Sequence, residues 1–161
     1  MNGVTDTGSA DRRPWPDQLT APDPTRVESI FTLYWQALGR LPTLIDANEN
    51  LLADALTTRL RDLVLEMMLA LNGIAPPPNP QTLNRYLGDS QRAAIEKTLV
   101  APSADPDTWI GRAVALTVIY QWYAPQLVDK YVLSYPHEFE AEIQAKLCDA
   151  LPQWPQSITS E

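Results

Sequence analysis

The sequence predicts an all-α protein, a single-domain bundle of five to six helices whose extended termini contain proline and tryptophan. Three observations support this class. Apolar residues recur at helical spacing in several segments, no segment alternates with the period of two that a strand needs, and proline-rich stretches separate the helical segments. Because 45% of the 161 residues are apolar, one globular domain is expected. We place a disordered or extended arm at 1–24, the helical domain at 25–151 and an extended tail at 152–161.

The first two helices follow from apolar spacing and from helix-start signals. Thr25 and Glu28 have the spacing of a capping box, which predicts a helix from Thr25 that ends near 39–42. The next helix should span 46–72, with a core stripe at Leu52, Leu56, Leu60, Leu63, Met67 and Leu71. Its second half is apolar nearly all round except for Glu66. We therefore expect that half to be buried in the protein or in an oligomer interface.

The segment after Gly73 is rich in proline and should be an extended linker. Two short helices are then expected at 80–87 and 89–99, with Gly88 between them. A last helix should cover 136–150. We expect its inward residues to be Phe139, Ile143, Leu147 and Ala150, and its outward residues to be Glu138, Glu142 and Lys146.

The segment 105–131 carries the most information, because it predicts a helix that is apolar on two sides. At 100° per residue, Trp109, Ala113, Leu116, Tyr120 and Tyr123 share one face, and Gly111, Ala115, Val118 and Trp122 share the opposite face. Asp105 followed by Pro106 should start the helix, and Pro125 should end it near Ala124, with a short helix at 125–131. We expect both faces to be covered by other helices. The alternative is that one aromatic face contacts a partner.

Charge and targeting signals favour a cytoplasmic protein. The formal net charge of −8 disfavours nucleic acid as a partner and fits a basic protein partner. No N-terminal signal peptide is apparent, and the longest apolar run is too short to span a bilayer. The single cysteine, Cys148, cannot form an internal disulfide, and we expect it to fill space on the last helix.

The residues needed for common catalytic sites are sparse. His137 is the only histidine, so any site that pairs a nucleophile with a histidine would have to use it. We expect this residue at a solvent-exposed helix start. We find no phosphate-binding glycine motif and no zinc ligand set, and we expect no cofactor, no metal and no enzymatic activity. Residues 80–99 have the form of a helix-turn-helix, but their net charge of only +1 makes DNA binding the least favoured hypothesis.

The aromatic content points to protein–protein contact instead. Five Trp and six Tyr against two Phe is a composition that favours interfaces. The leading hypothesis is a non-enzymatic interaction module (an adaptor, assembly factor or regulatory subunit) that acts through an apolar-aromatic helical surface. The candidate contact residues are Trp109, Trp122, Tyr123, Tyr131 and Trp154.

Three further possibilities stay open at this point. A homodimer could form through the apolar end of the helix 46–72. A small molecule or substrate could bind in a pocket between helices, lined by Trp109, Tyr120 and Met67. The Trp-Pro pairs at 15–16 and 154–155 could dock on their own domain or on a partner.

Overall fold

The computed structural model describes residues 19–78, 82–99 and 103–158. Within these ranges the chain forms six α-helices and one short 3-10 helix and no strand, which confirms the all-α class. The elements are α1 (Pro24–Leu38), α2 (Leu41–Asp46), α3 (Asn50–Leu71), η1 (Leu83–Tyr86), α4 (Asp89–Glu96), α5 (Pro106–Tyr131) and α6 (His137–Ala150).

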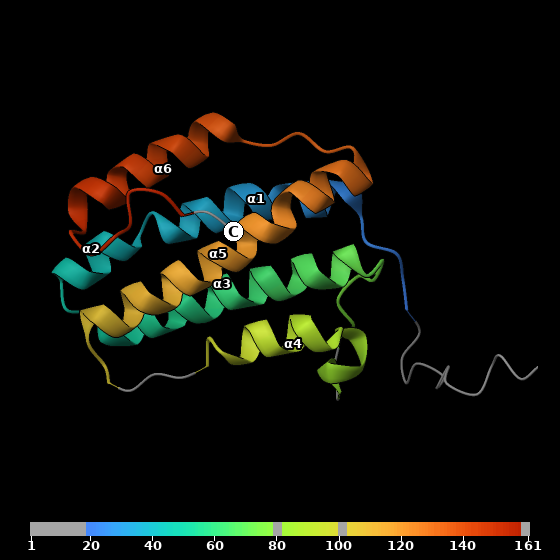
Figure 1. Cartoon of the computed structure of the whole chain (residues 1–161), viewed down its shortest axis with the longest axis horizontal. Helices are drawn as coiled ribbons and strands as arrows, with labels where there is room; N and C mark the ends of the chain where they lie inside the picture. The colour runs from blue at the N-terminus through green and yellow to red at the C-terminus, as the bar shows by residue number, and fades with distance from the viewer. Residues whose placement is uncertain (1–18, 79–81, 100–102, 159–161) are drawn as a thin grey trace, which may run out of the picture.

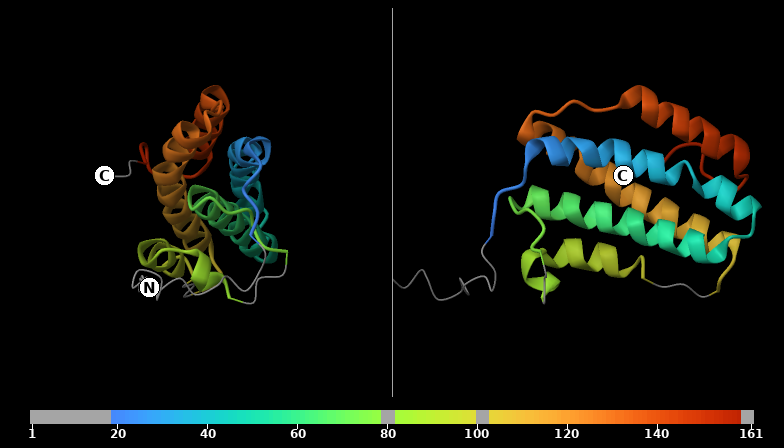
Figure 2. Two further views of the ribbon diagram at one scale, coloured as in Figure 1. Left: turned by 90° about the vertical axis from the view of Figure 1, so that its right-hand side faces the viewer. Right: turned by 180° about the vertical axis from the view of Figure 1, so that it is seen from behind.

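The two long helices form the centre of the bundle. α5 packs along α3, and α1 packs against both of them. In Figure 1, α5 lies in front of α1 and α3, with α6 above it and α4 below it. The views from the side and from behind confirm this order (Figure 2). One cluster of buried side chains joins these helices, and its largest members come from α1, α3 and α5. Among the described residues, no helix is stacked on the outer side of α5 (Figures 1 and 2).

α1 begins one residue before the predicted start and uses a different cap. The side chain of Asp23 accepts a hydrogen bond from the Thr25 amide at 3.0 Å, and Pro24 occupies the first turn. The predicted capping box is therefore wrong. The carboxylate of Glu28 instead accepts from the amide of Ser134, at 3.0 Å, and ties α1 to the segment between α5 and α6.

The predicted helix 46–72 corresponds to α3, and the short helix α2 before it was not predicted. Pro42 lies in the first turn of α2, which ends at Asp46, and Asn48 then adopts a left-handed backbone with φ of 57°. α3 starts only at Asn50. This boundary was missed because no glycine or proline marks the turn, and asparagine is the residue that tolerates a left-handed φ best after glycine.

The apolar end of α3 is covered by the chain itself. Leu69 packs in a small cluster with Ile74 and Tyr86 from the following segment. The hydroxyl of Tyr131 donates to the Ala70 carbonyl at 2.7 Å, which seals the same end from the side of α5. The homodimer stays a prediction, but the side chains on which it rested are already buried.

The predicted helices at 80–87 and 89–99 are shorter than expected. The first is a single 3-10 turn, η1, and residues 79–81 lie outside the described ranges. The second is α4, which ends at Glu96. Tertiary bonds hold this segment, since the side-chain amide of Asn72 donates both to the Tyr86 carbonyl and to Gln91 Oε1, each at 2.8 Å. A helix-turn-helix unit of two helices is therefore not formed here.

α5 continues through Pro125, where the sequence predicted a break. Ala124 and Leu127, on either side of the proline, are buried against the bundle. A proline inside a helix costs about 3 kcal/mol, and burying a leucine returns about 2 kcal/mol, so packing of this last turn offsets most of the penalty. The amide group of Gln126 also donates to the Trp122 carbonyl at 2.9 Å. α5 ends only at Val132, which has a left-handed φ of 54°.

α6 and the tail close the fold over α1. Ile143 and Leu147 are buried as expected, Phe139 is half-buried, and Ala150 is exposed, so its inward assignment is wrong. The ammonium of Lys146 donates to the Gly39 carbonyl at the end of α1, at 2.9 Å. Within the described ranges, no helix is long and apolar enough to cross a membrane.

The described part of the tail docks on the domain. Trp154 is 2% exposed, and its indole N–H donates to Gln144 Oε1 on α6 at 3.3 Å. Cys148 is half-buried, and its thiol lies 3.7 Å from the Pro155 carbonyl, so it faces the docked tail and not open solvent. Trp15, in the corresponding N-terminal pair, lies outside the described residues.

Candidate interaction surface

The outer face of α5 is apolar and open to solvent. Gly111, Ala115, Val118 and Trp122 recur at helical spacing along it, and we call these four residues the α5 stripe. Trp122 is 56% exposed and Val118 is 36% exposed. A Cβ placed on Gly111 would meet no atom within 4 Å. The expectation that both apolar faces of this helix would be covered is therefore wrong for this face.

The opposite face of α5 explains why the stripe points outward. Ala113, Leu116 and Tyr120 are fully buried against α1 and α3. Because residues three, four and seven apart share one side of a helix, burying that set turns the α5 stripe away from the core. The stripe is therefore presented on a helix whose orientation is fixed by packing.

Burial separates the five predicted contact residues into two groups. Trp109 is 5% exposed and donates to Asn50 Oδ1 at 2.9 Å, and Tyr123 is 8% exposed. Trp154 is buried under the tail, as described above, and Tyr131 is half-buried with its hydroxyl bonded to α3. Only Trp122, of the five, presents most of its side chain to solvent. Partner contact by these residues stays a prediction, and Trp122 is the one that a partner could reach without unfolding.

The pocket predicted at Trp109, Tyr120 and Met67 is filled by protein side chains. Tyr120 and Met67 are fully buried, and the Tyr120 ring stacks on Tyr34 with centroids 4.1 Å apart. All three side chains belong to the core cluster. They stabilise the fold, so a ligand site would have to be built from other residues.

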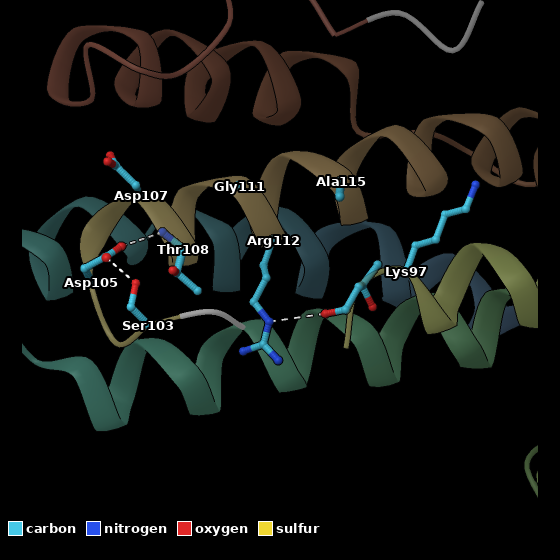
Figure 3. A pocket seen from close by; sticks show the side chains of 9 residues that line it. Lys97, Ser103, Asp105, Asp107, Thr108, Gly111, Arg112 and Ala115 are labelled. Atoms are coloured by element: carbon cyan, nitrogen blue, oxygen red, sulfur yellow. Dashed lines mark hydrogen bonds between the residues drawn. The ribbon is translucent and has the colours of Figure 1, made fainter. Parts of the chain in front are cut away.

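A shallow cavity of about 410 Å³ flanks the N-terminal half of the stripe (Figure 3). Gly111 and Ala115 form its apolar edge, and Arg112 and Lys97 lie on its α4 side. Arg112 is not free, because its guanidinium donates to the Thr98 carbonyl at 3.2 Å and pairs with Asp54 at 3.0 Å. The first bond holds the segment after α4 against α5, and the ion pair ties α5 to α3.

The start of α5 forms another wall of this cavity. Asp105 caps the helix by accepting from the Thr108 amide at 2.9 Å, and it also accepts from the Ser103 hydroxyl (Figure 3). These two hydrogen bonds lower the pKa of Asp105, with the Ser103 bond as the larger cause. The predicted cap at Asp105 is confirmed, and its carboxylate is committed to the helix start.

A deeper cavity of about 260 Å³ lies between α5 and the start of α6, beside the C-terminal half of the stripe. We call it the α5–α6 cavity. Its lining combines three apolar residues of α5 with tyrosine, histidine, amide and carboxylate side chains. The lining residues are Gln121, Ala124, Pro125, Val128, Asp129, Tyr135, His137 and Glu140.

One wall of the α5–α6 cavity is anchored in the core by a chain of hydrogen bonds. The buried indole N–H of Trp35 donates to the Tyr120 hydroxyl at 3.1 Å and to the Tyr135 hydroxyl at 3.2 Å. The two tyrosine hydroxyls are 2.9 Å apart and bonded to each other. Burial is the main cause that raises the pKa of both tyrosines, and the charge of Glu140 adds to it. Tyr135 therefore enters the cavity as a neutral hydroxyl with a fixed position.

Neither cavity assembles a familiar catalytic or metal-binding group. His137 is exposed, as the sequence predicted, and its ring packs against Tyr135 with centroids 4.8 Å apart. Within the described ranges, no three His, Cys, Asp or Glu side chains are grouped so that they could hold a metal ion. The residues that line the two cavities offer apolar contact, hydrogen bonding and carboxylate charge.

Comparison with known proteins returns no match: no family model fits the chain, and no curated protein or solved structure is significantly similar to it. The surface is therefore interpreted from its own residues.

Several residues of this surface were not among the sequence candidates. Val118 was placed on the second face of the helix but was expected to be covered, and Pro125 was interpreted only as a helix end. Glu140 was not considered as part of a contact surface. The signal that could have found them is the helical wheel extended past Pro125, which puts Pro125 and Asp129 on the same side as Trp122.

Proposed function

We propose that this protein is a non-enzymatic interaction module whose contact surface is the α5 stripe. The observation that carries the proposal is the exposed Trp122, which lies one turn from the exposed Val118 on a helix that is fixed by its buried face. Single exposed apolar residues are ordinary, but a continuous apolar run along one helix is typical of a surface that another protein covers.

The shape of the stripe suits a partner that lies along α5. Gly111 and Ala115 are small and exposed, so the backbone of a partner segment can approach closely at that end. Val118 and Trp122 supply bulk at the other end. An apolar helix or extended segment laid along such a face is a common mode of recognition, and tryptophan is enriched among the residues that dominate binding energy.

Site-specific photo-crosslinking in the native host tests the proposal. A photoreactive phenylalanine analogue at Val118 should capture a stoichiometric protein, and the same analogue at Leu51 serves as the matched control. Leu51 is 86% exposed, but it lies on α3 and outside the α5 stripe. The Trp122→Ala substitution should weaken binding of the purified partner by about 30-fold, as expected for a central tryptophan worth about 2 kcal/mol. Equal crosslinking at both positions would remove the support for this surface.

The alternative function, binding of a small molecule, would use the α5–α6 cavity, because the lining first expected for it is buried. Its volume of about 260 Å³ is near the lower end for ligand pockets. Native mass spectrometry of protein purified from its own host distinguishes the two. A retained small molecule would favour the alternative, whereas the interaction module should have the mass of the polypeptide alone.

A further inference from the structure

We infer that the α5–α6 cavity receives a lysine or arginine side chain of a basic partner segment that lies along the α5 stripe. This inference rests on the proposed function and adds the chemistry of the partner. The stripe supplies apolar contact, whereas the cavity next to Pro125 supplies a place for one long cationic side chain. The partner so defined carries a basic residue close in space to the apolar residues that cover Val118 and Trp122.

The floor of the cavity suits the apolar stem of such a side chain. We use the word floor for its apolar lining residues, which are Ala124, Pro125 and Val128 of α5. Lysine and arginine bury their methylene stems along apolar surface while the charged group stays among polar partners. An anionic side chain is shorter and could not use this floor in the same way.

We call the polar lining residues of the cavity its rim, namely Gln121, Asp129, Tyr135, His137 and Glu140. Asp129 and Glu140 supply carboxylates, which only accept hydrogen bonds, whereas the Tyr135 hydroxyl is already bonded to Trp35 and Tyr120. Pro125 has no N–H, so the Gln121 carbonyl lacks its usual helical donor on the turn that lines the cavity. A guanidinium or ammonium group carries only donors, which matches this set.

The two rim carboxylates have no cation of their own. Neither Asp129 nor Glu140 is in an ion pair within the described ranges, and no lysine or arginine lines the cavity. Lys130 is next to Asp129 in sequence but points to α3, where its ammonium donates to the Leu71 carbonyl at 2.6 Å. Glu140 accepts a long bond of 3.5 Å from the Gln121 amide and also interacts with the side chain of Tyr135, and both of these partners are neutral. Charge complementarity therefore favours a cationic occupant.

The start of α6 does not reverse this preference. A helix N-terminus carries a partial positive charge that attracts anions. In α6 that end already has two carboxylates in its first turn, at Glu138 and Glu140. Of these two, only Glu140 lines the cavity, and together with Asp129 of α5 it would confront an acidic partner with two carboxylates.

The first test uses isolated side-chain analogues on the full chain. Titration with n-butylammonium and n-butylguanidinium, followed by ¹H–¹⁵N correlation spectra, should shift the amides of the cavity lining with half-saturation at millimolar concentration. The neutral probe 1-butanol should bind at least fivefold more weakly. If 1-butanol binds as well as the cations, or if the cations shift no cavity amide, the inference is overturned.

Substitution of the rim locates the effect. The pair Asp129→Asn and Glu140→Gln should weaken n-butylammonium binding at least fivefold, whereas Glu142→Gln should leave it unchanged. Glu142 is the matched control because it is an exposed carboxylate of α6 outside the cavity lining. If the double variant does not fold, the salt dependence of cation binding to the wild-type chain still tests the inference. Raising NaCl from about 20 to 500 mM should weaken the cations several-fold and leave 1-butanol unaffected, because salt screens charge only. The same affinity for the cations at both salt concentrations would overturn the inference.

The second test connects the cavity to the partner captured through Val118. The double variant should raise the Kd of that partner about tenfold, and Glu142→Gln should not change it. If the double variant binds the partner normally but no longer binds n-butylammonium, the cavity serves free amines and the inference fails. The proposed function can then still stand, because it is decided by Trp122→Ala and not by the carboxylates.

Discussion

The buried contact between Tyr34 of α1 and Thr117 of α5 provides a quantitative test of how these two helices are joined. Both side chains are fully buried, and the two hydroxyl oxygens are 2.9 Å apart. The Thr117 hydroxyl already donates to the Ala113 carbonyl at 2.7 Å, so the Tyr34 hydroxyl must be the donor between them. Burial, the main cause, raises the pKa of Tyr34 well above its usual value of about 10, which keeps that donor protonated.

The two single substitutions should therefore differ in cost. Tyr34→Phe removes a donor but leaves the Thr117 hydrogen satisfied, so we expect the free energy of unfolding to fall by about 1 kcal/mol. Thr117→Val leaves the Tyr34 O–H buried without an acceptor, which should cost about 1 to 3 kcal/mol. The double variant removes both polar groups and should cost clearly less than the sum, with a coupling energy of about 1 kcal/mol.

Urea unfolding followed by far-UV circular dichroism measures all three variants. The melting temperature of Tyr34→Phe should drop by about 2 to 4 °C for a domain of this size. Tyr131→Phe is the control, because its hydroxyl is half-buried and water can replace its bond to the Ala70 carbonyl. Additive single costs, or a Tyr34→Phe variant as stable as wild type, would refute the reasoning.

Three further outcomes are expected. Arg61→Met should lower the free energy of unfolding, measured by urea titration, by about 2 kcal/mol, because the buried guanidinium donates to the Thr98 hydroxyl and carbonyl at 2.9 and 2.8 Å. Arg59 is exposed, so Arg59→Met should have little effect, and equal effects of the two substitutions would contradict this. Gly111→Ala and Val132→Gly should each raise the free energy of unfolding by about 0.5 to 1 kcal/mol, which a higher melting temperature would show. Gly111 is helical with open space around it, and Val132 has a left-handed φ. A lower melting temperature for either variant would show that the local backbone is different. Tyr34, Tyr120 and Tyr135 have raised folded pKa values, so their contribution to stability is complete below the unfolded pKa of about 10 and is lost as the pH rises above it. Absorbance at 295 nm should show these three tyrosines ionising only together with unfolding, and ionisation of all six tyrosines near pH 10 in the folded state would disprove this.

Local sequence was sufficient where the signal was periodic and strong. The apolar spacing located both ends of α6 and the start of α1 to within one residue, and the Asp105–Pro106 pair located the start of α5. Boundaries set by backbone conformation at polar residues were missed. Asn48 separates α2 from α3 with a left-handed φ. Asparagine tolerates this conformation but also adopts others, so its presence in the sequence does not predict a helix boundary.

The candidate surface could be predicted only in part. The wheel placed Trp122 and Val118 on one face, and Trp122 was among the predicted contacts, but spacing alone could not say which of two apolar faces would be buried. Trp109 and Tyr123 looked equally suitable, yet they lie against the core. The cavity beside Pro125 joins α5 to residues up to 19 positions further along the chain, so no local pattern marked it.

The sequence by itself therefore determined the class of fold, the main helices and the presence of more apolar surface on α5 than one packed face requires, because these depend on period and composition. Only the tertiary structure decided which apolar surfaces are buried by other segments and which stay exposed. The apolar end of α3 is buried by η1, the following segment and Tyr131, whereas the stripe ending at Trp122 stays open. The reason is that burial depends on contacts between distant segments, and those segments cover the C-terminal end of α3 while leaving one side of α5 to the solvent.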